Sequence, residues 1–143
     1  GFLDGLGDSK DKFKIVAQQD GGAALDKSME LAEDIITASP DMDAFFCIND
    51  PSALGAAAAI KAANKTGKIG VYSIDASPDG KQALLDGEFT AVACQVPVQI
   101  ADYSFKEAVK YVNGDTKIDE KKVYLDSHLV SKDEAEKTLK EWQ

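Results

Sequence analysis

Three polar side chains stand at the ends of three apolar segments with strand character. They are Asn49 after residues 45–48, Asp75 after residues 69–74, and Gln95 after residues 89–94. In an open parallel sheet, ligands bind just beyond the carboxyl ends of the strands. A carboxylate accepts hydroxyl hydrogens, and an amide both donates and accepts hydrogen bonds. These three side chains, with no Lys, Cys or His among them, therefore predict a site for a neutral polyhydroxy molecule.

Around these residues, segments of strand character alternate with segments of helical periodicity. The expected strands cover residues 12–18, 45–50, 69–75 and 89–95, with a last extended segment at 123–130. The expected helices cover about residues 23–39, 51–65, 78–86 and 98–113, and a final helix follows Ser131. This alternation predicts an α/β domain with a doubly wound, mostly parallel sheet between two layers of helices.

Local signals define several of these boundaries. Asp50 is expected to cap the helix that starts at Pro51. Ser131 and Glu134 have the spacing of a capping box at the start of the last helix. In helix 23–39, one apolar face is expected to be buried. Its members are Leu25, Met29, Ala32 and Ile36.

Composition narrows the classes of function. The formal net charge of -9 argues against nucleic-acid binding, because phosphate contacts need basic side chains. His128 is the only histidine, so the sequence supports neither a zinc site nor a catalytic triad. Cys47 and Cys94 lie in separate strands, and one strand between them would place them too far apart for a disulfide. An enzyme is not expected, and neither is a metal or a cofactor.

The three polar residues belong to longer motifs. Asn49-Asp50 with Ala53-Leu54-Gly55-Ala56 is similar to the N-D-x-x-A-x-G-A segment of periplasmic sugar-binding proteins of the ribose-binding type. Asp75 with Asp79-Gly80 resembles their D-x-x-x-D-G segment, and Gln95-Val96-Pro97 with Ile100 resembles their Q-x-P-x-x-I segment. The order and spacing of these motifs agree with that family from Gly1 to about Val130.

This resemblance implies the carboxyl-terminal lobe of a two-lobed solute-binding protein. Such a protein captures a sugar or polyol and delivers it to the membrane permease of an ABC-type importer, in the periplasm or at the cell surface of a bacterium. The ligand domain of lactose-repressor-like transcription factors shares the fold. A sugar-responsive repressor, whose pocket would control DNA binding by a separate head, is therefore the alternative function.

The resemblance also implies roles for particular residues. Asn49, Asp75 and Gln95 fall on positions that bind the sugar hydroxyls, although each could instead only cap a helix or a turn. Asp20 and Asp50 are further possible ligand groups, with the helix-capping role favoured for Asp50. Ala23 stands where ribose-type proteins carry an aromatic residue, which suggests a ligand that is larger than ribose or held differently.

The family topology divides the chain into three ranges. Residues 1–95 are expected to form the carboxyl-terminal lobe without its first strand, residues 96–125 to belong to the amino-terminal lobe, and residues 126–143 to form a return strand and terminal helix. Because the sequence opens abruptly at Gly1, it resembles a fragment. The exposed strand edge and the uncovered helix 98–113 then predict self-association, or pairing with a missing amino-terminal part. The apolar face of that helix comprises Ile100, Tyr103, Ala108, Tyr111 and Val112.

Overall fold

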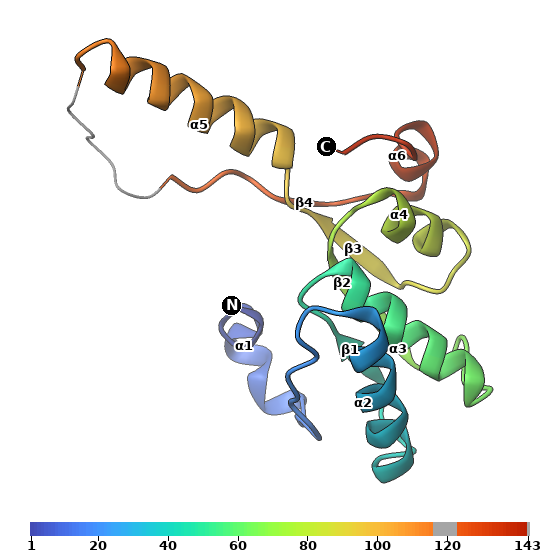
Figure 1. Ribbon diagram of the computed structural model, residues 1–143. Coiled ribbons are helices and arrows are strands. Elements are labelled where there is room, and N and C mark those ends of the chain that lie inside the picture. Colours follow the sequence, from blue (N-terminus) through green and yellow to red (C-terminus); the bar gives the residue numbers. More distant parts are fainter. Residues whose placement is uncertain (116–122, 143) are drawn as a thin grey trace.

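A four-stranded sheet forms the centre of the domain (Figure 1). The computed structural model describes residues 1–115 and 123–142. Within them the strand order is β1 (Ala44–Phe46), β2 (Gly70–Asp75), β3 (Ala91–Cys94) and β4 (His128–Leu129). The first three strands are parallel, and β4 runs antiparallel to β3. The predicted α/β class with a mostly parallel sheet is confirmed.

The helices precede, connect and follow the strands along the chain. They are α1 (Phe2–Gly5), the 3₁₀ helix η1 (Gly7–Lys12), α2 (Leu25–Ala38), α3 (Asp50–Ala62), α4 (Pro78–Leu85), α5 (Pro97–Val112) and α6 (Lys132–Lys137). Both α3 and α4 join neighbouring parallel strands in the same direction along the sheet. Right-handed crossovers of this kind place both helices on one face. In agreement, α3 contacts both α2 and α4, and α4 contacts α6.

The core lies between this helical layer and the sheet. Its most buried side chains are small or β-branched, such as Ala53, Val71 and Val92. Of the predicted buried face of α2, Ala32 and Ile36 are buried and Met29 is partly buried, but Leu25 remains 40% exposed. The Leu25 side chain is exposed because α3 packs closely against the Leu25 backbone. A Cβ on Gly55 of α3 would lie only 2.4 Å from the Leu25 carbonyl oxygen. The backbone of Leu25, rather than its side chain, therefore forms this helix contact.

The carboxyl-terminal helix is joined to α4 through a buried lysine. Lys81 is 0% exposed, and its Nζ donates hydrogen bonds to the backbone oxygens of Thr138 (2.9 Å) and Glu141 (2.7 Å). Ser131 caps α6 by accepting a hydrogen bond from the Glu134 backbone nitrogen at 3.2 Å, as the capping signal predicts. The ammonium group thus binds two backbone carbonyls in the segment that follows α6.

The predicted strand at residues 12–18 is wrong. Lys12 ends η1, and residues 13–20 form an unpaired segment. Phe13, Ile15 and Val16 are about half exposed there. An extended segment becomes a strand only by pairing its backbone groups, and within the described residues β1 pairs with β2 alone. On the same side of the domain, the Phe2 ring stacks on Phe46 at 4.4 Å between centroids.

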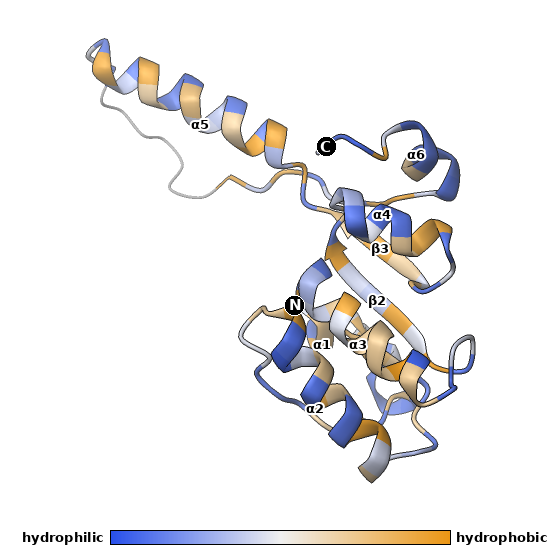
Figure 2. Ribbon diagram, turned by 45° about the vertical axis from the view of Figure 1, so that its right-hand side comes forward, coloured by the Kyte–Doolittle hydropathy of each residue, from blue (hydrophilic) through white to orange (hydrophobic). Residues whose placement is uncertain are grey.

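Helix α5 projects away from the sheet and the other helices (Figure 1). Apolar residues recur along it (Figure 2), yet none of its residues is buried. The five residues of its predicted apolar face are all exposed. A groove of about 880 Å³ lies beside this face, and Val123, Tyr124 and Leu125 also line it. None of the helices in the described ranges is long and apolar enough to cross a membrane.

Candidate ligand-binding site

The carboxyl ends of β1, β2 and β3 bring the predicted site residues to one edge of the sheet. Asp75 ends the central strand β2, and the Gln95 Nε2 atom donates a hydrogen bond of 2.6 Å to Asp75 Oδ1. The Asp50 backbone nitrogen, which follows Asn49, donates to Asp75 Oδ2 at 3.2 Å. The parallel arrangement therefore places Asp75 between residues that follow the two flanking strands.

Asn49, not Asp50, is the N-cap of α3, so the capping prediction for Asp50 is wrong. The backbone of Asn49 is extended (φ -159°, ψ 167°), and its Oδ1 accepts a hydrogen bond from the Ser52 nitrogen at 3.1 Å. Its Nδ2 donates to the Ala23 carbonyl oxygen at 3.2 Å. An amide can make four hydrogen bonds, so Asn49 keeps one hydrogen and one lone pair for a ligand.

Gln95 is exposed and stands where the chain leaves β3. Its Nε2 is used by Asp75, and its Oε1 has no protein partner in the part of the chain that the structure describes. The next residue, Val96, adopts a left-handed conformation (φ 49°), after which α5 starts at Pro97. This turn directs the helix away from the sheet and leaves the Gln95 amide at the edge of the site.

The carboxyl group of Asp75 is partly removed from water. Burial raises its pKa above the ordinary value for aspartate, the Asp50 backbone hydrogen bond lowers it, and the negative charge of Asp50 raises it. No lysine or histidine forms an ion pair with Asp75 within residues 1–115 and 123–142, and the sequence contains no arginine. A carboxylate in this setting gains from hydroxyl donors that replace the lost water.

The side chain of Asp50 lies beneath this edge and is 1% exposed. Its Oδ1 accepts from Ser73 Oγ at 2.6 Å, and its Oδ2 accepts from the backbone nitrogen and Oγ of Ser77 at 2.8 and 2.7 Å. Sequence reasoning missed both serines. The position of Ser73 on the inward face of β2, two residues after Val71, was a usable signal, because a polar side chain in a core needs a partner.

Asp20 lies in the exposed segment before α2. Its Oδ1 accepts a hydrogen bond from the Gly22 backbone nitrogen at 2.8 Å, which closes a local turn. This turn leads to Ala23, whose carbonyl oxygen binds Asn49. The structure therefore connects the Asp20 segment to the site through the backbone, without a direct contact between Asp20 and the three predicted side chains.

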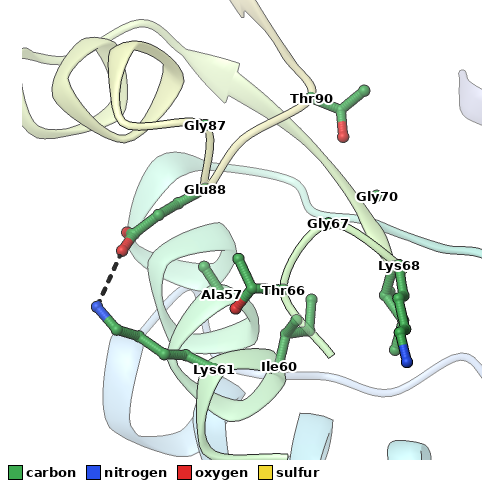
Figure 3. Close-up of a pocket in the computed structure, with 11 residues that line it drawn as sticks. Ala57, Ile60, Lys61, Thr66, Gly67, Lys68, Gly70, Gly87, Glu88 and Thr90 are labelled. Carbon is green, nitrogen blue, oxygen red and sulfur yellow. Dashed lines mark hydrogen bonds and ion pairs between the residues drawn. The ribbon is translucent and has the colours of Figure 1, made fainter. Parts of the chain in front are cut away.

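A separate cavity of about 110 Å³ lies near the amino ends of β2 and β3 (Figure 3). Lys61 and Glu88 form an ion pair of 3.4 Å at its wall, and Gly67, Gly70 and Thr90 also line it. Because the predicted site residues follow the opposite ends of these strands, this cavity is not part of their site.

Comparison with known proteins defines the class of this domain. The profile of the periplasmic binding protein domain family matches residues 1–116, and the chain belongs to this family. The ribose import binding protein of Salmonella typhimurium is 35% identical over 104 residues, which make up 73% of this chain and 35% of that protein.

Solved structures agree with this assignment. The crystal structure of a galactofuranose binding protein has a TM-score of 0.86 and 31% identity, and the match covers 96% of this chain and 47% of that chain. A structure from Mycobacterium smegmatis in complex with β-D-fucofuranose has a TM-score of 0.84 and 29% identity, covering 97% and 45%. The chain thus spans less than half the length of these relatives.

Proposed function

We propose that these residues form one lobe of a solute-binding protein that captures a sugar or polyol and delivers it to an ABC-type importer. The membrane permease would be its partner, and the periplasm or cell surface its location. Family membership supports this function, and the relatives named above are sugar-binding and import-binding proteins. The repressor alternative is not favoured, because the named relatives include an import binding protein and a sugar binding protein and no transcription regulator. They are also binding proteins rather than enzymes, and we propose no catalytic activity.

The observation that carries the proposal is the hydrogen-bonding character of the strand ends. Asn49, Asp75 and Gln95 offer a carboxylate and two amides at one edge, and no ion pair satisfies the carboxylate in the part of the chain that the structure describes. Hydroxyl groups can use the remaining donors and acceptors of all three side chains. An anionic solute would be repelled by this carboxylate. The ligand class that fits is therefore a neutral polyhydroxy molecule.

The identity of the sugar can be narrowed by Ala23. Its small side chain offers no ring on which a sugar could stack, and its backbone is in the left-handed region (φ 55°). Two of the similar structures carry furanose sugars in their names. We propose a ligand other than ribose, held mainly by hydrogen bonds on this lobe. Asp20, which is exposed, is a further candidate ligand group, whereas the carboxylate of Asp50 is buried and its oxygens are bound by Ser73 and Ser77.

The division of the chain into lobes is also a proposal. The exposed apolar face of α5 and the groove beside residues 123–125 support the assignment of residues 96–125 to an amino-terminal lobe, which would cover them. The 143-residue chain produced alone should then self-associate or bind a separate amino-terminal fragment. A constant monomer mass in light scattering over a range of concentrations, with a cooperative melt, contradicts this expectation.

Asp75→Ala in the full-length protein tests the binding function. The unaltered protein is first screened by thermal shift and calorimetry against D-ribose, D-allose, D-galactose, D-fucose and myo-inositol. Loss of the charge-assisted hydrogen bonds should then cost about 1.5–3 kcal/mol or more, which is roughly tenfold to a hundredfold in affinity. Asp79→Asn, an exposed aspartate in the next turn, serves as the matched control. Equal affinity of Asp75→Ala and the unaltered protein contradicts the site assignment.

A further inference from the structure

We propose that Asp50 is a positioning residue, whose buried carboxylate holds the turn after β2 and thereby fixes how Asp75 presents its own carboxylate to a ligand. Asp50 does not contact the ligand in this proposal. The inference deepens the proposed function and rests on the role of Asp75 in it. It concerns a residue that sequence motifs alone present as a second candidate ligand group.

The first observation is that Asp50 bonds both sides of one turn. Ser73 stands two residues before Asp75, and Ser77 stands two residues after it. The Asp50 carboxylate accepts one hydrogen bond from Ser73 and two from Ser77, all between 2.6 and 2.8 Å. Its backbone nitrogen donates to the Asp75 carboxylate itself at 3.2 Å. Asp50, at the start of α3, thus contacts the residues on both sides of this turn and also the side chain of Asp75 within it.

The second observation is the conformation of this turn. Asp75 has φ 128° and Ala76 has φ 57°, although neither residue is a glycine. Residues with a Cβ rarely adopt such conformations and keep them only where the surrounding structure holds them. Pairing with β3 holds the strand before this turn, and the hydrogen bonds from Ser73 and Ser77 to Asp50 join the two flanks of the turn. Without them, the strained residues are free to relax, and the Asp75 side chain would change direction.

The third observation is that the carboxylate is enclosed by two helix starts. Asp50 is the first residue of α3, and Ser77, which donates to it, is the N-cap of α4. The partial positive charge at helix amino ends favours a carboxylate there. The first turn of α4 also packs directly on it, since a Cβ on Gly80 would lie 2.1 Å from Asp50 Oδ2. A ligand therefore has no access to this group, and its effect on binding must pass through Asp75.

The test uses the full-length protein and the tightest-binding sugar of the panel above, together with its monodeoxy analogues. The informative analogue is the one that lacks the hydroxyl group bound by Asp75. It is recognised because it binds the unaltered protein and the Asp75→Ala variant with the same affinity. Asp50→Ala should lower affinity for the parent sugar by about tenfold or more, and affinity for this analogue much less. Asp50→Asn, which keeps one acceptor oxygen, should restore part of the loss. Asp79→Asn is the control.

A merely structural role would lower the affinities of the parent sugar and the analogue by the same factor, and that outcome overturns the proposal. If Asp50→Ala does not fold, Ser73→Ala decides. It removes one of the hydrogen bonds to Asp50 while leaving every charge in place. It should show the same selective loss of affinity for the parent sugar, and a uniform loss or none overturns the proposal.

A ligand-independent measurement separates this inference from the proposed function. If the unaltered protein binds no sugar of the panel, the proposed function has failed, and the titration of the Asp75 carboxyl group by carbon NMR then decides. Burial raises the pKa of Asp75. Relaxation of the turn in Ser73→Ala should expose the group and lower that pKa toward its ordinary value. A folded Ser73→Ala variant with an unchanged Asp75 titration overturns the proposal.

Discussion

Replacing Gly80 with alanine would test how closely α4 packs on the Asp50 carboxylate. Gly80 is the third residue of α4, and its backbone is outside the left-handed region, so alanine can adopt its conformation. Helix propensity by itself would favour the substitution by at most about 1 kcal/mol. Any destabilisation must therefore come from the space that the new methyl group would occupy.

That space is already filled. A Cβ on Gly80 would lie 2.1 Å from Oδ2, 2.4 Å from Cγ and 2.7 Å from Oδ1 of Asp50. The carboxylate cannot rotate away without breaking hydrogen bonds to Ser73 or Ser77. Overpacking costs about 1–3 kcal/mol, and a lost charge-assisted hydrogen bond costs about 1.5–3 kcal/mol. After the gain in helix propensity is subtracted from the sum of these two costs, we expect Gly80→Ala to lower the free energy of unfolding by about 1.5–5 kcal/mol.

Urea unfolding of the full-length protein measures this change, with an unchanged m-value as the sign that only stability is affected. Gly5→Ala is the control, because nothing lies within 4 Å of a Cβ built there. In the double variant Gly80→Ala, Asp50→Ala, the carboxylate no longer occupies the space of the new methyl group. The loss of unfolding free energy in the double variant should therefore be smaller than the sum of the losses in the two single variants. A Gly80→Ala variant as stable as the unaltered protein, or strictly additive losses, refutes the packing argument.

Three further predictions follow from the described contacts. Sugar binding should weaken on acidification, and the weakening should begin above the pH at which ordinary aspartates titrate, because the pKa of Asp75 is raised and its protonated form accepts fewer hydroxyl hydrogens. Calorimetry that gives the same Kd from about pH 7 to about pH 4 contradicts this. Burial raises the pKa of the Cys47 thiol to about 12, so a disulfide reagent should label it only after unfolding, and rapid labelling of the folded protein would argue against its burial. Lys81→Met should lower the free energy of unfolding by about 1.5–3 kcal/mol, because the charge-assisted hydrogen bonds from the ammonium to the carbonyls of Thr138 and Glu141 are lost; urea unfolding measures the change, and unaltered stability would show that the ammonium adds nothing.

The sequence alone determined the order of most elements and the place of the candidate site. Apolar runs predicted β1, β2 and β3, and the helix signals after them predicted α3, α4 and α5 within a few residues. These patterns act over one or two helical turns or a few strand residues, so neighbouring residues suffice to recognise them. The polar residues at the strand ends followed from the same reasoning, because parallel strands share one carboxyl edge.

Tertiary structure decided which groups pair with one another. Residues 13–20 have the composition of a strand, but a strand also requires a neighbour for its backbone groups, and that is a property of the assembled sheet. Asn49 and Asp50 are both good helix caps by residue type. Asn49 caps α3 because the Asp50 carboxylate instead accepts hydrogen bonds from Ser73 and Ser77. These serines lie 23 and 27 positions after Asp50 in the chain. Such partners are set by how strands and helices lie side by side, and no local pattern in the sequence records that distance.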